Sequence, residues 1–261
     1  MKSLLDHIRP NRTARRRLSH SVDPLAKLRN QFPDVPNSHL LIYQSVQELT
    51  MTSPERVFAL CNAVEYIVEN RIEGDCVECG VWRGGSMAAT AQVLVQANEM
   101  NRRLWMYDTF EGMSEPSKAD VDLRGQAAKQ LLDDQDRLDE KSIWCFSPLN
   151  QVKETMRKTG YDASKIEFVK GKVEDTLPVK TPDKIALLRL DTDWYESTRC
   201  EMEHLFPRLV PGGVIIIDDY GHWEGCRRAI DEYLKKNEVS LFLNRIDYTG
   251  RIGVKSQLVN I

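Results

Sequence analysis

Residues 185–193 of this chain read IALLRLDTD, and residues 211–219 read PGGVIIIDD. In each stretch a mostly apolar run is followed directly by aspartates. This pattern is typical of a buried parallel strand with acids at its end. One segment with apolar residues at helical spacing separates the two, so their strands should be neighbours. The acids would then meet at one edge of an α/β sheet, where such sheets bind ligands.

The acids at these strand ends are Asp191, Asp193, Asp218 and Asp219. Carboxylates brought this close repel each other unless a cation or a proton intervenes. Mg²⁺ prefers oxygen ligands and suits such a cluster. The same residues can also cap the helices that follow them. The acids alone leave both interpretations open, although acids at such an edge indicate an enzyme first.

Strands and helices alternate along the rest of the chain. Further strands are predicted at Cys76–Gly80, Leu104–Asp108, Ile166–Lys170, Leu241–Leu243 and Ile252–Val254. Helices are predicted to begin at Ser53 and Ser147 and to cover Ser86–Asn98 and Gly225–Lys236. This alternation predicts an α/β fold with a doubly wound, mostly parallel, seven-stranded sheet and helices on both faces.

Two segments fall outside this alternation. Residues 1–44 are polar, rich in arginine and proline, and weakly patterned, so we expect an N-terminal extension that is partly disordered or packs on a neighbouring subunit. Residues 45–261 are predicted to form a single domain. Within it, residues 113–146 form a long charged segment, and segments of this length between elements are usually functional, so we expect a lid.

The composition argues against several classes of protein. The net charge is −3, whereas nucleic-acid-binding proteins usually carry a basic excess. The sequence lacks an apolar run of about 18 residues, the length that a transmembrane helix needs. The six cysteines are scattered, as in proteins of a reducing compartment. We therefore expect a cytoplasmic protein without a nucleic-acid or membrane partner.

A glycine-rich turn follows the predicted strand at Cys76–Gly80. Residues 78–86 read ECGVWRGGS, an acid at a strand end, a turn and a helix start, which suits close approach of a ligand to the backbone. The spacing differs from the Gly-x-Gly-x-x-Gly of dinucleotide-binding folds. Asp108 ends the next strand, where a carboxylate can accept hydrogen bonds from ribose hydroxyls. An ordinary tight turn and a capping aspartate are the alternatives.

Four motifs in this order resemble the macrocin O-methyltransferase family: Glu78–Ser86, Tyr107–Gly112, Leu188–Asp193, and Pro211–Gly213 with Ile217–Tyr220. The resemblance covers about residues 45–255. It implies a Rossmann-like class I methyltransferase that depends on S-adenosylmethionine and Mg²⁺. Members of this family methylate sugar hydroxyls on macrolide and aminocoumarin natural products.

The resemblance also implies roles for individual residues. Asp191, Asp218 and Asp219 would hold Mg²⁺, and Asp191 or Asp193 would remove the proton from the sugar hydroxyl. The residues implied to bind the cofactor are Glu78, Gly80 and Ser86 for the methionine part, Asp108 for the ribose, Thr50 and Met51 beside it, and Gly171 and Lys172 near the adenine.

Other functions fit parts of the sequence. A nucleotide-binding oxidoreductase on a similar fold is disfavoured because the dinucleotide motif is missing. A catechol-type O-methyltransferase would need a lysine base three residues after Asp191, where this chain has Trp194. A non-catalytic binding protein would have no need of mutually repelling acids. The expected acceptor is a sugar of a natural product or a glycan, and we expect a homo-oligomer.

Overall fold

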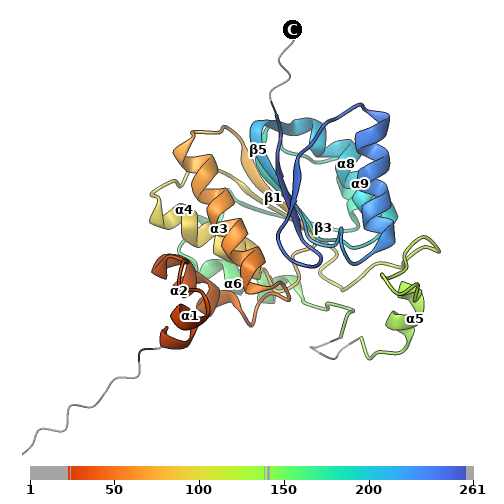
Figure 1. Ribbon diagram of the computed structural model, residues 1–261, viewed down its shortest axis with the longest axis horizontal. Coiled ribbons are helices and arrows are strands. Elements are labelled where there is room, and N and C mark those ends of the chain that lie inside the picture. The colour runs from red at the N-terminus through yellow and green to blue at the C-terminus, as the bar shows by residue number, and fades with distance from the viewer. Residues whose placement is uncertain (1–22, 24, 138, 140–141, 257–261) are drawn as a thin grey trace, which may run out of the picture.

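The computed structural model describes residues 23, 25–137, 139 and 142–256, which fold around a seven-stranded sheet (Figure 1). The strands lie in the order β3-β2-β1-β4-β5-β7-β6. Their bounds are Asp75–Cys79 (β1), Leu104–Asp108 (β2), Ile166–Lys170 (β3), Ile185–Leu190 (β4), Leu209–Ile217 (β5), Leu243–Arg245 (β6) and Arg251–Val254 (β7). All neighbours from β3 to β5 are parallel, and β7 is antiparallel to both β5 and β6. The predicted fold class is confirmed.

The strand order reverses between β1 and β4. The chain runs outward from β1 through β2 to β3 and then returns to β4 on the other side of β1. Cys79, Leu190 and Ile217 lie in register across β1, β4 and β5. The turns that leave these three strands therefore lie side by side, and a crevice at such a reversal is where open α/β sheets bind ligands.

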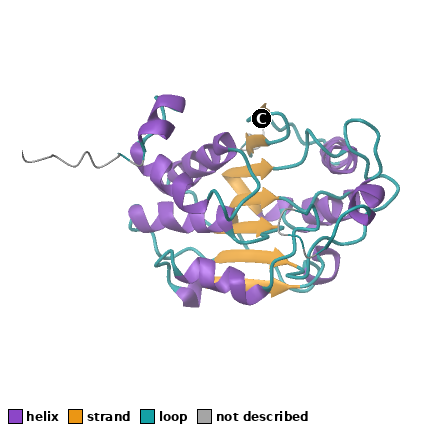
Figure 2. Cartoon of the chain, turned by 90° about the horizontal axis from the view of Figure 1, so that it is seen from below, coloured by secondary structure: helices purple, strands orange, loops and turns teal. Residues whose placement is uncertain are grey.

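Helices cover both faces of the sheet (Figure 2). The helices packed in the core on one face are α2 (Asn37–Val46), α3 (Pro54–Glu69), α4 (Gly85–Gln96) and α6 (Leu149–Arg157). Those packed on the other face are α5 (Ala128–Asp133), α7 (Val173–Thr176), α8 (Tyr195–His204) and α9 (Glu224–Lys236). Because successive strand residues point to opposite faces, Cys76 joins the first core and Val77 the second. Among the described residues, no helix is long and apolar enough to cross a membrane.

Part of the predicted N-terminal extension is helical. α1 (Ala26–Gln31) precedes α2, and Ile42 and Val46 of α2 are buried in the same core as α3 and α4. α2 therefore crosses the predicted boundary between residues 44 and 45. The remainder of the predicted extension, residues 1–22, lies outside the described residues.

The predicted strand Leu241–Leu243 is shifted, since β6 spans Leu243–Arg245. Leu241 packs against the second core from outside the sheet, while the side chain of Phe242 is 81% exposed. The apolar residues of the predicted strand thus belong partly to the loop that precedes β6. The predicted bounds were wrong by two residues at each end.

The turn after β1 brings two backbones into contact. Gly80 has a φ of +80°, and a Cβ on it would lie 2.0 Å from the carbonyl oxygen of Asp191. The N–H of Asp191 donates to the carbonyl of Cys79 at 2.9 Å, and the N–H of Gly80 donates to that of Tyr107 at 2.9 Å. A glycine is required here both for its conformation and for the space that it leaves.

Substitution of Gly80 by alanine tests this close approach, and Gly160 provides a matched control. Gly160 also has a positive φ, +75°, but an added Cβ there would meet nothing within 4 Å. We expect Gly160→Ala to lower the free energy of unfolding by about 1–2 kcal/mol, the cost of a left-handed residue. Gly80→Ala should lower the free energy of unfolding by about 1–3 kcal/mol more, because the new Cβ would overlap the Asp191 carbonyl oxygen. Urea unfolding measures both, and equal losses would contradict the steric argument.

Candidate active site

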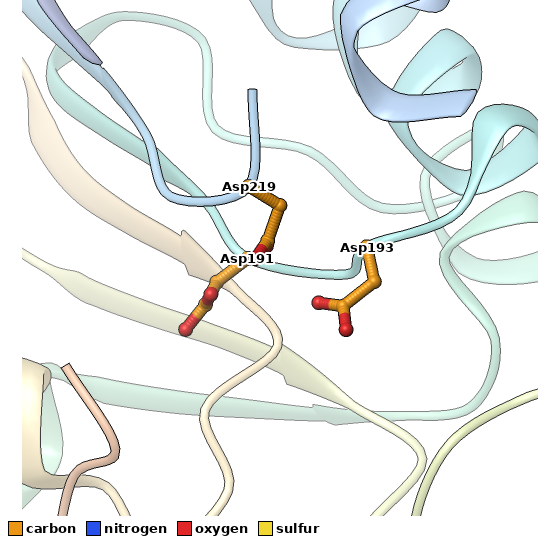
Figure 3. Close-up of side chains that lie close together, drawn as sticks. All are labelled: Asp191, Asp193 and Asp219. Atoms are coloured by element: carbon orange, nitrogen blue, oxygen red, sulfur yellow. The ribbon is translucent and has the colours of Figure 1, made fainter. Parts of the chain in front are cut away.

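Three aspartates converge at the crevice between β1 and β4 (Figure 3). Asp191 and Asp193 follow β4, and Asp219 follows β5. One carboxylate oxygen from each lies within 4.8 Å of those of the other two. Within the described part of the chain, this is the group of acids arranged to hold a cation. It contains two of the three predicted metal ligands, Asp191 and Asp219, together with the predicted base Asp193.

Asp218, the third predicted ligand, is held by arginines. Arg189 donates to its Oδ1 at 2.6 Å, and Arg56 of α3 contacts its Oδ2. Arg56 also forms an ion pair with Asp247 at 2.9 Å. Asp218 lies beside the cluster, but its carboxylate is engaged by the two guanidinium groups.

Arg189, which the sequence interpretation missed, is at the centre of the site. Its side chain points from β4 to the same face as Glu78 on β1, because Glu78 and Arg189 are paired in register. One guanidinium nitrogen donates to Glu78 at 2.5 Å and to Asp191 at 2.6 Å, while the other donates to Asp218. Arg189 is 4% exposed. A charged residue in the otherwise apolar run of residues 185–190 was the available signal.

The acids outweigh these cations, and the pKa values of Asp191, Asp193 and Asp219 are raised. Burial, with repulsion between the acids, raises the pKa of Asp191 and Asp219 well above the usual range, although Arg189 opposes this for Asp191. The same causes raise the pKa of Asp193 to about 7. Oδ2 of Asp219 is buried without a hydrogen-bond partner among the described residues. A hard divalent cation would relieve both the crowding and this missing contact, so the residues present fit Mg²⁺.

Asp193 lies at the centre of a tight three-residue turn. Its φ is +69°, and the N–H of Trp194 donates to the carbonyl of Thr192 at 2.8 Å. A γ-turn with positive φ at its central residue is rare and strained. The indole N–H of Trp223 donates to the Asp193 carboxylate at 3.1 Å. Strain of this kind is held by surrounding contacts and is concentrated at functional sites.

Two adjoining cavities open at the crevice. Each of the eight residues predicted to bind the cofactor lines one of them. The first cavity is lined by Gly80, Asp108, Gly171 and Lys172. The second is lined by Thr50, Met51, Glu78 and Ser86, and by the four aspartates at the ends of β4 and β5. Asp191 lines both cavities. The cluster therefore lies where the two spaces meet.

Asp108 also holds the glycine-rich turn. Its carboxylate accepts the backbone N–H of Val81 at 2.8 Å, of Trp82 at 3.2 Å and of Phe110 at 2.6 Å. Burial nevertheless raises the pKa of Asp108, and these hydrogen bonds oppose that shift. Trp82 is itself left-handed, with a φ of +44°. Asp108 thus fixes the turn that forms one wall of the first cavity.

The segment predicted as a lid contributes side chains to both cavities and is anchored to α8 between them. Met113 lines the first cavity and Ile143 the second. Between them, Asp120 is buried and accepts the N–H of Tyr195 at the start of α8, at 2.7 Å. Residues 138, 140 and 141 lie outside the described residues.

An aromatic wall forms part of the lining of the second cavity. His222, Trp223 and Tyr248 line it. The rings of His222 and Trp223 pack edge to face at 4.6 Å, and the Tyr248 hydroxyl hydrogen-bonds Nδ1 of His222 at 2.9 Å. Tyr248 and Met51 are 55% and 53% exposed, so the cavity has apolar side chains at its mouth. These residues carried no recognisable motif, and the turns after β5 and β6 bring them together.

Comparison with known proteins agrees with this geometry. The family model of the macrocin O-methyltransferases (TylF) matches residues 11–253. The 8-demethyl-8-(2,3-dimethoxy-alpha-L-rhamnosyl)-tetracenomycin-C 4'-O-methyltransferase of Streptomyces olivaceus is 37% identical over 201 residues, 77% of this chain and 73% of that protein. The demethyldecarbamoylnovobiocin O-methyltransferase of Streptomyces niveus is 32% identical over 86% of this chain and 79% of its own.

Solved structures of methyltransferases share the fold. The solved structure of the O-methyltransferase NovP superposes with a TM-score of 0.69 at 30% identity, over 80% of this chain and 83% of that one. The calicheamicin methyltransferase CalS11 shares the fold with a TM-score of 0.61 at 18% identity. The chain belongs to the macrocin O-methyltransferase (TylF) family and is an S-adenosylmethionine-dependent O-methyltransferase.

Proposed function

We propose that this enzyme methylates a hydroxyl group on a sugar of a natural product or glycan, with the help of Mg²⁺. The position of Asp191, which lines both cavities and belongs to the acidic cluster, carries the proposal. It supports a reaction in which the adenosine occupies the first cavity and the methionine part of the cofactor meets the acceptor in the second. The names of related enzymes support the acceptor class, since one acts on a rhamnosyl tetracenomycin and another on mycinamicin III.

The cavities divide the cofactor between them in this proposal. The adenosine lies in the first cavity, with the ribose at Asp108 and the adenine near Gly171 and Lys172. The methionine part extends past Gly80 toward Glu78 and Ser86, and Thr50 and Met51 close the other side. S-adenosylmethionine supplies the methyl group. The protein's task is then to hold the acceptor oxygen in line with the methyl carbon and the sulfur.

We assign Asp191, Asp218 and Asp219 as the ligands of Mg²⁺. Asp193 is assigned as the base that removes the proton of the sugar hydroxyl. A bound Mg²⁺ would supply positive charge that favours the deprotonated form of a sugar hydroxyl. Asp193 suits the base because its carboxylate lies in the cluster beside the proposed ligands Asp191 and Asp219 without being assigned to the metal. Its contact with Trp223 also directs it toward the aromatic wall. Asp218 would have to exchange an arginine contact for the cation.

The aromatic wall suits the acceptor. Aromatic faces with a polar edge can pack on the apolar face of a sugar ring while their donors and acceptors contact its hydroxyls. A catechol-type reaction with a base three residues after Asp191 is disfavoured, because Trp194 is buried and its indole N–H donates to the carbonyl of Ser114 at 3.0 Å. The cytoplasmic location and the homo-oligomer stay predictions.

Asp191→Asn tests the central assignment. We expect loss of methyl transfer to glycosides, because the variant lacks the carboxylate shared by both spaces, while S-adenosylmethionine still binds. Mass spectrometry of the glycosides for methylated product measures turnover, and calorimetry measures cofactor binding. Excess EDTA should also abolish turnover of the unchanged enzyme. Full activity in either case would exclude the metal mechanism.

Two variants distinguish the proposed base from a proposed metal ligand: Asp193→Asn removes the base and Asp218→Asn removes a ligand. We expect Asp193→Asn to lower kcat by about 100-fold or more, the scale of general base catalysis, with Mn²⁺ affinity retained. Asp218→Asn should weaken Mn²⁺ binding instead. Titration of Mn²⁺ followed by electron paramagnetic resonance, together with kcat at saturating metal, checks both variants. The reverse pattern would make Asp193 the third ligand, as the cluster geometry alone would suggest.

Ile143→Ala and Met113→Ala test the proposed lid. Because Ile143 lines the second cavity and Met113 the first, the first variant should raise KM for the acceptor and the second KM for S-adenosylmethionine. About 10-fold is expected for a truncated apolar contact worth 1–2 kcal/mol. Steady-state kinetics with each substrate varied in turn gives both values. Unchanged KM values would reject a lid that contacts the substrates.

A further inference from the structure

A buried glutamate beneath the active site contacts the turn that carries Asp193. Glu201 lies on α8 and is 0% exposed. The hydroxyl of Thr192 donates to its Oε1 at 2.8 Å, and the thiol of Cys79, at the end of β1, lies next to the same carboxyl. Glu201 therefore reaches the ends of β1 and β4 from below the crevice, without lining either cavity.

The turn needs such a contact because its conformation is unfavourable. Left-handed backbone at a residue other than glycine costs about 1–3 kcal/mol and persists only where the surroundings hold it, and Asp193 has a φ of +69°. Ser197 contributes a long hydrogen bond of 3.3 Å from its hydroxyl to the Thr192 carbonyl. The bond from Thr192 to Glu201 is shorter and comes from the side chain between the two aspartates.

Burial of a carboxyl group is itself costly. A polar group removed from water lowers stability unless it is hydrogen-bonded. An apolar side chain at position 201 of α8 would be buried without this loss of stability. We propose that Glu201 is a positioning residue, which acts through Thr192 to hold the turn that presents Asp191 and Asp193. The inference rests on the proposed function for the roles of those two aspartates.

Burial disfavours the charged form of this carboxyl group. Burial raises the pKa of Glu201 well above its usual range, and the Thr192 hydrogen bond only partly opposes this. What Thr192 requires is an acceptor oxygen, and an amide oxygen supplies one equally well. Glutamine should therefore replace Glu201, whereas methionine, of similar size but without an oxygen, should not.

The first test compares Glu201→Met with Glu201→Gln. We expect Glu201→Met to lower kcat by about 100-fold, the scale of a small misplacement of a catalytic group, while KM and Kd for S-adenosylmethionine stay unchanged. Glu201→Gln should retain most of kcat. Glu203→Gln is the matched control, since Glu203 lies on the same helix but is exposed and paired with Arg199. A normal kcat in Glu201→Met, or an equal loss in Glu201→Gln, would overturn the proposal.

The second test asks whether Glu201 acts through Thr192. Thr192→Val removes the same hydrogen bond from the other side, and it serves alone if Glu201→Met does not fold. Each single change should lower kcat, and the double variant should be no worse than the more impaired single one, because residues that share one interaction are not additive. Additive losses would show that Glu201 does not act through Thr192.

A third test, by hydrogen exchange, does not require the identity of the acceptor substrate. Hydrogen exchange of the backbone over residues 191–195 reports how firmly the turn is held. Glu201→Met should speed exchange there and Glu201→Gln should not, even if the unchanged enzyme methylates no glycoside. Inactivity of the unchanged enzyme would contradict the proposed function, whereas unchanged exchange in Glu201→Met would contradict the positioning role.

Discussion

One buried guanidinium group joins the carboxyl ends of the three central strands. Arg189 on β4 binds Glu78 on β1, Asp191 at the end of β4 and Asp218 after β5. Since removal of one partner from a buried ion pair leaves an uncompensated charge, such networks strongly constrain the groups within them. The place where the strand order reverses is thereby fixed, and the active site is built on it.

The charges at this edge have two different tasks. Glu78 and Asp218 are engaged by arginines, with Arg56 as the second cation on Asp218. Asp193 and Asp219 have raised pKa values because burial and neighbouring acids disfavour their charged forms. The arginines stabilise the folded crevice, and in the proposed function the less compensated acids join Asp191 and Asp218 in binding a cation or accepting a proton.

Local sequence patterns predicted the strands that carry the site, and the family resemblance implied the eight residues that line the cavities. Gly80 and Asp108 also carry a local signal, since one lies in a glycine-rich turn and the other at the end of a strand. Arg189 and Glu201 were missed for a physical reason: most of their partners lie on other elements, so no spacing marks them. Of the aromatic wall, Tyr248 was missed likewise, since α9 and β6 separate it from His222.

The sequence by itself determined the α/β fold, the family resemblance and the acids at the ends of β4 and β5. Alternating apolar runs and glycine turns are local properties of the chain, and each strand end carries its own acids. Only the tertiary structure decided which of those acids pair with arginines and which face one another in the cluster. Arg56 reaches Asp218 from a helix far away in the sequence, and a left-handed turn directs Asp193 toward Asp191 and Asp219. Pairing of charges depends on distance in space, which sequence spacing does not give.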